Sequence, residues 1–244
     1  MVDIYSRPDL YNAIHKTYSW DKQLITSAAE QAGGPVLELA AGTGRLAQLI
    51  LDLGLDYTGI DLSDEFIHVA KEKYGEVATF HIGDMQQFKM DLLFKFIFIS
   101  FNSFLHNLTD RAAINCLSCV RNHLDDSGQF LVSIFIPDPS FLYRDETQLF
   151  PATSIFELEG DSCRIMETNR FNEETQINKL SWQLERNGEL ESNVFEFTQR
   201  MFYPHNMDIL FDEADLKIVK KMGDYDGTPM DEESGMQIYV CEKA

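Results

Sequence analysis

Hydrophobic positions in the first half of the chain alternate between two periodicities. Short apolar runs have the length and composition of buried strands, and they cover residues 36–39, 57–60, 79–82, 94–100 and 129–136. The segments between them carry apolar residues at helical spacing, over residues 21–31, 45–53, 63–73 and 109–123. Asp21 and Ser63 stand where a helix cap is expected. Strands that alternate with helices in this way predict an α/β fold with a doubly wound, mostly parallel sheet.

The pattern changes after Pro137, where strands follow one another without helices between them. These predicted strands are separated by turn-like stretches and cover residues 154–158, 164–171, 177–185 and 191–203. Asn187-Gly188 is a hairpin signal between two of them. Consecutive strands of this kind make an antiparallel sheet, which we expect as a cap inserted into the parallel core.

The end of the chain returns to the core pattern. A predicted helix over 206–214 precedes two predicted strands, 216–222 and 236–241, which suit a seven-stranded sheet with an antiparallel last strand. The expected domains are a helical lid over 1–34, a core over 35–137 and 204–244, and a β cap over 138–203.

Charge limits the partners of the protein. The 244 residues include 40 Asp and Glu against 20 Lys and Arg, which gives a net charge of -20. Affinity for nucleic acids and anionic membranes depends on cationic side chains, so neither is expected as a partner. The first ten residues have no apolar run typical of a signal peptide, and the apolar stretch 92–104 is interrupted by polar residues. We therefore expect a cytoplasmic protein.

Cysteines and histidines do not indicate a metal site. Cys116 and Cys119 have a metal-like spacing but lie within an apolar helical pattern, with no second ligand pair. We interpret them as structural cysteines. The histidines show no mutual ligand spacing, and no metal is expected.

A turn of small residues, Ala40–Gly44, lies between the first core strand and a predicted helix. Free backbone N–H groups at such a turn can bind a ligand, and Asp61 after the second strand can accept hydrogen bonds from ribose hydroxyls. This pattern also fits a loosely written dinucleotide fingerprint. Glu38 and Asp84 favour another cofactor, because a carboxylate before the turn suits a ligand with positive groups better than a pyrophosphate. Asp84 can accept a hydrogen bond from an adenine amine.

Three motifs carry a family resemblance: Val36–Arg45, Gly59–Ser63 and Gly83–Met85. Together they resemble the cofactor motifs of class I S-adenosylmethionine-dependent methyltransferases. A weaker resemblance to small-molecule N-methyltransferases of the glycine/sarcosine and deoxyamino-sugar kinds lies in Phe101–His106 and in the antiparallel insert.

The resemblance implies S-adenosylmethionine as the cofactor. It implies that the loop contacts the methionine part, Asp61 the ribose, and Asp84 with Met85 the adenine. The chain departs from the family pattern at Ala40, where many members have glycine. The residues expected at the cofactor are Glu38, Ala40, Gly42, Gly44, Arg45, Asp61, Leu62, Asp84, Met85 and Phe101.

Methyl transfer needs alignment of donor and acceptor and, for some acceptors, a base. His106 follows the fourth strand at the edge of the sheet where ligands bind in such folds, so it is the first catalytic candidate. A histidine at a helix start that only bonds a backbone carbonyl is the alternative. Tyr11, in the N-terminal segment, is the second catalytic candidate, and packing of its ring is the alternative. Asn102, Arg200 and Tyr203 are the candidates for substrate contact.

The resulting hypothesis is a methyltransferase that acts on nitrogen or oxygen of a small molecule beneath a cap. An NAD(P)-dependent oxidoreductase and a non-catalytic S-adenosylmethionine-binding regulatory protein are the alternatives. A homodimer is left open.

Overall fold

The computed structural model describes residues 3–244, which divide into two compact units. The core unit is Ser19–Ile136 together with Phe202–Ala244. The cap unit is Pro137–Met201 together with the N-terminal segment up to Tyr18. The two internal boundaries lie close to those expected from the sequence. The N-terminal boundary follows residue 18, where the sequence predicted residue 34, so the expected lid over 1–34 is divided between the units.

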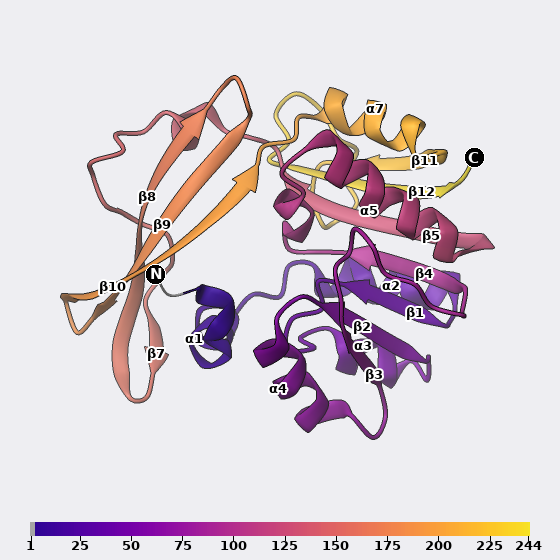
Figure 1. Cartoon of the computed structure of the whole chain (residues 1–244), viewed down its shortest axis with the longest axis horizontal. Helices are drawn as coiled ribbons and strands as arrows, with labels where there is room; N and C mark the ends of the chain where they lie inside the picture. Colours follow the sequence, from indigo (N-terminus) through magenta and orange to yellow (C-terminus); the bar gives the residue numbers. More distant parts are fainter. Residues whose placement is uncertain (1–2) are drawn as a thin grey trace. The chain divides into compact units, whose positions relative to one another are not determined.

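The core unit is built on a seven-stranded sheet with the order β11-β12-β5-β4-β1-β2-β3 (Figure 1). Neighbouring strands among β1 to β5 run parallel, whereas β12 is antiparallel to both β5 and β11. The strands are β1 (Val36–Leu39), β2 (Tyr57–Asp61), β3 (Thr79–Ile82), β4 (Phe94–Ile99), β5 (Leu124–Phe135), β11 (Leu216–Met222) and β12 (Met236–Lys243). The doubly wound sheet predicted from the alternating pattern is confirmed.

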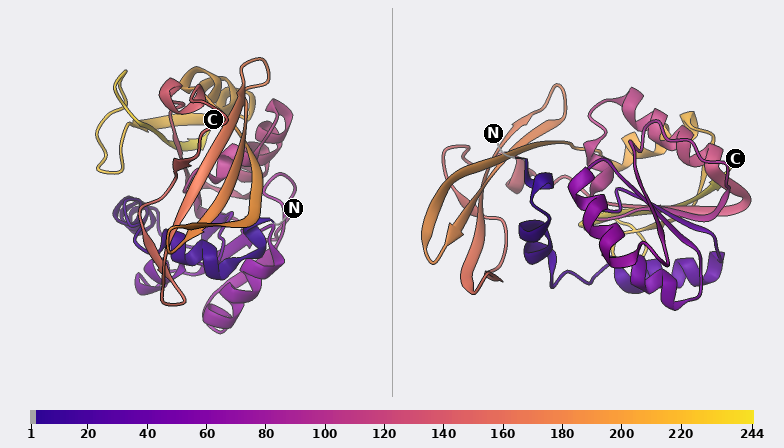
Figure 2. Two further views of the ribbon diagram at one scale, coloured as in Figure 1. Left: turned by 90° about the vertical axis from the view of Figure 1, so that its left-hand side faces the viewer. Right: turned by 60° about the horizontal axis from the view of Figure 1, so that its bottom comes forward.

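Helices cover both faces of this sheet, as the right-hand view of Figure 2 shows. Apolar side chains of three helices pack against Val36, Tyr57 and Phe96 on one face. These helices are α2 (Lys22–Ala32), α3 (Ala47–Asp52) and α4 (Asp64–Tyr74). The other face carries α5 (Asp110–His123) and α7 (Pro204–Glu213), which contact each other (Figure 1). A short 3-10 helix, η2 (Ser103–His106), follows β4.

The two predicted helix caps have different outcomes. The Ser63 side chain accepts a hydrogen bond from the backbone N–H of Phe66 at 3.1 Å, so the predicted cap of α4 is confirmed. Asp21 is the residue before α2, but its side chain makes no capping hydrogen bond. Its backbone is already helical there, and its carboxylate binds an arginine instead.

The cap unit contains an antiparallel sheet with the order β10-β9-β8-β6, and β7 pairs with β8. This sheet confirms the predicted change of pattern after Pro137, although the sequence did not predict β6. Its strands are β6 (Phe150–Pro151), β7 (Phe156–Leu158), β8 (Asp161–Asn172), β9 (Ile177–Arg186) and β10 (Glu189–Arg200), and helix α6 (Pro139–Leu142) precedes them.

Residues before Ser19 belong to the cap unit because their apolar side chains complete its core. The segment forms η1 (Ile4–Ser6) and α1 (Pro8–His15). Ile4, Leu10 and Ile14 are buried with residues of the cap sheet, among them Ile165 and Phe195. Helix α2, by contrast, buries Ile25 and Ala29 in the core unit. The two halves of the lid expected over 1–34 therefore belong to different units, because their apolar side chains are buried against different sheets.

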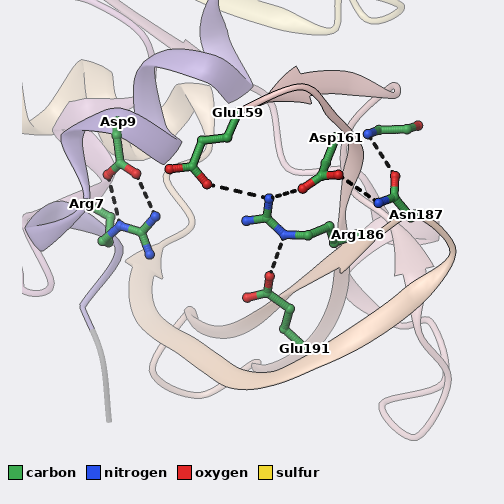
Figure 3. A network of polar contacts seen from close by, with 8 residues as sticks. Arg7, Asp9, Glu159, Asp161, Arg186, Asn187 and Glu191 are labelled. Carbon is green, nitrogen blue, oxygen red and sulfur yellow. Dashed lines mark hydrogen bonds and ion pairs between the residues drawn. The ribbon is translucent and has the colours of Figure 1, made fainter.

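Ion pairs surround the hairpin turn of the cap (Figure 3). The Arg186 guanidinium binds Asp161 at 2.7 Å and Glu191 at 2.8 Å. Asn187, the first residue of the predicted hairpin turn, has a φ of 52° and donates from Nδ2 to Asp161. The turn signal and the charges around it therefore fix one end of the β9–β10 hairpin.

A single buried amide joins the two points where the core chain leaves for the cap and returns. Gln237 of β12 is fully buried, and its Nε2 donates to the carbonyl oxygen of Phe135 at 3.3 Å. The same atom donates to the carbonyl oxygen of Phe202 at 2.6 Å. Gln237 thus holds Phe135, at the end of β5, close to Phe202, the first residue of the core unit after the insert.

Among residues 3–244 there is no helix with both the length and the apolar character needed to cross a membrane.

Candidate active site

The turn after β1 adopts a backbone that favours glycine. Ala40, Gly42 and Gly44 have φ values of 56°, 57° and 75°. A Cβ atom at Gly44 would lie 3.1 Å from the ring of Tyr74 and 3.2 Å from that of Phe80. The turn therefore rests directly on aromatic rings, and Gly44 is required both by its φ and by this close approach.

Asp61 at the end of β2 holds this turn. Its Oδ2 accepts a hydrogen bond from the backbone N–H of Gly42 at 2.7 Å, and its Oδ1 accepts one from Ser63 at 2.9 Å. Burial raises the pKa of Asp61, and the backbone donors oppose that rise by stabilising the charged form. The Leu62 N–H is a third backbone donor to this carboxylate. An ionised carboxylate has about four acceptor positions, so about one remains for a hydroxyl group of a ligand.

Glu38 lies in β1, two residues before the turn, and is buried. Its Oε2 accepts a hydrogen bond from the hydroxyl of Tyr57 at 2.5 Å. Burial raises the pKa of Glu38 to about 8, even though the Tyr57 hydroxyl and the Arg45 charge favour the ionised form. The sequence analysis missed Tyr57. The parallel register that pairs Val36 with Tyr57 and Glu38 with Gly59 is what places both side chains on one face.

Arg45, at the end of the turn, binds a carboxylate of the protein itself. Its Nη1 lies 2.9 Å from Oδ1 of Asp21, and its Nη2 binds Oδ2 of the same residue. The guanidinium also lies over the ring of Phe101, 5.3 Å from the ring centroid. Arg45 was expected to contact the cofactor, and the structure assigns two of its nitrogens to Asp21.

The edge near β3 offers an apolar surface with an acid beside it. Leu62, directly after Asp61, is 72% exposed. Asp84 follows β3, and its Oδ1 accepts a hydrogen bond from the backbone N–H of Gln86 at 2.9 Å. The sulfur of Met85 lies 3.8 Å from Nδ2 of Asn107, a buried residue that the sequence analysis also missed. A flat aromatic ligand with an exocyclic amine suits this combination.

The segment after β4 is fixed by internal contacts. Phe101 and Asn102 have φ values of 58° and 63°. The side-chain Oδ1 of Asn102 accepts a hydrogen bond from the backbone N–H of Phe135 at 2.8 Å. This bond joins the segment after β4 to the end of β5, and the role of Asn102 in substrate contact stays a prediction. His106 ends the 3-10 helix that begins at Ser103.

The remaining candidates are distributed over both units. Tyr11 lies on α1 of the cap unit, where its ring is 4.5 Å from that of His15. Arg200 ends β10 in the cap unit and is buried. Tyr203 lies in the core unit, directly before α7, and stacks on His205. Four other candidates interact within the core unit. The Gly42 N–H binds Asp61, and the charges of Arg45 and Asp61 both act on the Glu38 carboxyl.

The cysteines do not form a reactive pair. Burial raises the pKa of Cys116 and of Cys119, and the Cys119 thiol donates to the carbonyl of Gln86. Within residues 3–244 no group of three or more histidines, cysteines and carboxylates is arranged to bind a metal.

The donor set fits S-adenosylmethionine. Carboxylates lie in or directly after three adjacent strands, at Glu38, Asp61 and Asp84. The turn between the first two is lined by small residues, and a Cβ atom at Gly42 would come within 4 Å of Phe66 only. Acids suit the ammonium and hydroxyl groups of such a ligand, and Leu62 with Met85 suits its adenine.

Comparison with known proteins finds a similarity in the central segment. Residues 36–128 match the family model described as a methyltransferase domain, and they include β1 to β4 and the network around the turn. Residues 36–128 are therefore similar to methyltransferase domains.

Curated proteins that are similar to this chain are described as methyltransferases. An uncharacterised methyltransferase of Staphylococcus carnosus is 29% identical over 123 residues, which is 50% of this chain and 56% of the relative. The putative methyltransferase YqeM of Bacillus subtilis is 28% identical over 144 residues, which is 54% of this chain and 58% of that protein. The chain thus spans little more than half the length of these relatives.

Solved structures match the whole chain at low identity and therefore show its fold. The CcbJ methyltransferase of Streptomyces caelestis has a TM-score of 0.80 at 22% identity, with both chains fully covered. CalS10, described as an amino pentose methyltransferase from Micromonospora echinaspora, has a TM-score of 0.71 at 14% identity and is covered over 98% of its length. The sugar N-methyltransferase KedS8 of Streptoalloteichus has a TM-score of 0.73 at 15% identity, with 96% of this chain and 92% of that chain covered. The fold of this chain is that of S-adenosylmethionine-dependent methyltransferases, with the antiparallel cap included.

Proposed function

We propose that the protein is an S-adenosylmethionine-dependent methyltransferase that transfers a methyl group to nitrogen or oxygen of a small-molecule acceptor. The observation that carries the proposal is the bridge from Gly42 to Asp61, which fixes the turn after β1 against the acid of β2. Such a bridge places a turn of small residues, where a ligand can approach the backbone closely, beside a carboxylate that can accept hydrogen bonds from ribose hydroxyls.

The names of two structurally similar proteins indicate which chemical class of methyl acceptor to test first. CalS10 and KedS8 are described as sugar methyltransferases, the first of an amino pentose and the second an N-methyltransferase. The matches cover 100% and 96% of this chain, so they extend beyond the core unit. We take amino sugars as the first acceptors to test and other amines and alcohols as the second.

The residues of this chain would act mainly by alignment. When bound, S-adenosylmethionine would supply a methyl group on a sulfonium, and the acceptor nitrogen or oxygen would bond to that carbon as the carbon–sulfur bond breaks and S-adenosylhomocysteine leaves. Asp61 would hold the ribose hydroxyls, and Asp84 with Leu62 and Met85 the adenine. Ionised Glu38, two residues before the turn, would stabilise the ammonium group of S-adenosylmethionine by charge attraction. Holding two reactants in position accounts for much of the rate in reactions of this kind.

A base is needed only if the acceptor must lose a proton before attack. His106 is the proposed base in the core unit, because it ends the segment that follows β4. Tyr11 of the cap unit is the other proposed catalytic residue. Asn102, Arg200 and Tyr203 remain proposed substrate contacts, and the amide oxygen of Asn102 also holds the segment after β4.

Calorimetry with S-adenosylhomocysteine and with NAD tests the proposal. Binding of S-adenosylhomocysteine without binding of NAD supports a methyltransferase, and the reverse result would indicate an oxidoreductase. Incubation with S-adenosylmethionine and a panel of amino sugars, amines and alcohols, read by mass spectrometry, then tests turnover. Binding without methylation of any panel member would favour a regulatory protein.

A further inference from the structure

Asp21 is a buried acid that the proposed function does not use. Its side chain is fully buried in the core unit, directly before α2. An unpaired carboxylate in such a place is costly, so its partner determines whether the site is stable. That partner is Arg45, which meets both carboxylate oxygens with two nitrogens. A two-point contact fixes the plane of the guanidinium as well as its position.

The fixed guanidinium in turn lies over Phe101. The distance from the Arg45 Cζ atom to the centroid of the Phe101 ring is 5.3 Å, within the range of a cation–π contact. Asp21, Arg45 and Phe101 therefore form a chain of contacts from the start of α2, across the end of the turn, to the segment after β4.

The contacts of Asp21, Arg45 and Phe101 end at the segment after β4, whose backbone conformation is unfavourable for non-glycine residues. Phe101 and Asn102 are consecutive non-glycine residues with positive φ, which costs free energy at each position. Such a conformation persists only where the surroundings hold it. The Asn102 side chain is held by Phe135, and the Phe101 ring is held by Arg45. Helix η2 follows directly, and His106 is its last residue.

We propose that Asp21 is a positioning residue for cofactor binding. It orients Arg45, and Arg45 keeps the turn after β1 and the segment after β4 in one fixed arrangement on two sides of the proposed cofactor. This inference rests on the proposed function and adds to it a residue that lies outside the cofactor motifs.

The test uses the affinity for S-adenosylhomocysteine, measured by calorimetry on folded protein well below its unfolding temperature. A residue that only stabilises the fold leaves this affinity unchanged, because calorimetry then reports on native molecules alone. Asp21→Asn removes the charge and one acceptor while conserving shape, and we expect affinity to fall about 10-fold or more. Asp125→Asn is the matched control, because Asp125 pairs with Lys95 at the opposite end of β4, 2.6 Å away. Its affinity should equal that of the wild-type protein.

Two more variants keep the test decisive if Asp21→Asn does not fold. Arg45→Lys retains the charge but loses the planar two-point contact, and we expect it to weaken binding as well. Phe101→Leu removes the ring, and combining it with Arg45→Lys should weaken binding by less than the product of the two single effects. Affinity in Asp21→Asn and Arg45→Lys equal to that of the control, or independent effects in the double variant, would overturn the inference. Absence of S-adenosylhomocysteine binding by the wild-type protein would instead overturn the proposed function.

Discussion

The backbone N–H of Gly42 donates a 2.7 Å hydrogen bond to Oδ2 of Asp61, which joins the turn after β1 to the end of β2. The two residues are nineteen positions apart in the sequence. The Asp61 carboxylate therefore has two roles: it shapes the turn, and it faces the proposed ribose position. A substitution there should affect stability and binding together.

Asp61→Asn tests the first role. An amide replaces one acceptor oxygen with a donor, so either Gly42 or Ser63 loses its partner, and the free energy of unfolding should fall by about 1–3 kcal/mol. Binding of S-adenosylhomocysteine should also weaken. Denaturant unfolding and calorimetry measure the two effects. Unchanged stability would show that the Gly42 bond contributes little.

Glu38→Gln should make stability less sensitive to pH. The pKa of Glu38 is raised from 4.5 to about 8 by burial, so the folded protein keeps this proton over a range in which the unfolded chain releases it. The stabilising contribution of the bound proton is present below pH 4.5 and is lost as pH rises towards 8. Glutamine mimics the protonated acid, so the variant should lose less stability than the wild-type protein between these values. Denaturant unfolding at several pH values measures the difference.

The same substitution should weaken S-adenosylhomocysteine binding at high pH. A ligand ammonium favours ionised Glu38, so wild-type affinity should rise as pH approaches about 8, where the free protein ionises. The glutamine variant cannot ionise and should lack this rise. Calorimetry at matched pH values measures both curves, and parallel curves would remove Glu38 from the binding of the ammonium.

Ala40→Gly should stabilise the protein. Ala40 has a φ of 56°, a conformation that costs a non-glycine residue about 1–2 kcal/mol. Glycine removes this cost but loses more chain entropy on folding, so a net gain of about 0.5–1 kcal/mol is expected. Thermal unfolding measures it. A lower midpoint would show that the alanine methyl group makes a contact that outweighs the backbone cost.

Gly44→Ala and Gly54→Ala form a matched pair for the packing of the turn. Their φ values are 75° and 72°, so the backbone cost of about 1 kcal/mol is shared. A Cβ atom at Gly54 meets nothing within 4 Å, whereas one at Gly44 meets Tyr74 at 3.1 Å. Gly44→Ala should therefore cost about 1–3 kcal/mol more than Gly54→Ala. Equal losses in denaturant unfolding would show that the rings of Tyr74 and Phe80 can move aside.

His106→Ala separates catalysis from cofactor binding. If His106 is the base, turnover of an acceptor found in the panel should fall by about 10²–10⁴-fold, while S-adenosylhomocysteine affinity stays the same. Steady-state kinetics and calorimetry give the two values. Full turnover in the variant would leave His106 with a structural role, and Tyr11→Phe would then be the next variant to measure.

The sequence predicted the elements of the core well because local patterns determine them. Strand and helix periodicities, the turn of small residues and the Ser63 cap are all readable within a short window of sequence. The cap sheet was predicted for the same reason, from the strand signals and the Asn187-Gly188 turn.

Partners that come from distant parts of the chain were not predictable. Asp21 looked like a helix cap because its neighbours in sequence are helical, yet it pairs with Arg45 across the core unit. Tyr57 meets Glu38 only because β1 and β2 are in a particular register. The N-terminal segment was assigned to one lid because nothing in its own pattern says which hydrophobic surface each half will cover.

Gln237 gives the inserted cap a preset point of attachment. One buried amide nitrogen binds the carbonyls of Phe135 and Phe202, on the two sides of the insert, so the gap that any inserted segment must bridge is set by the core. The entropy of closing a loop rises only slowly with its length, so inserts of very different size could join these ends at similar cost. A fold arranged this way can exchange one inserted module for another during evolution while the core unit stays as it is.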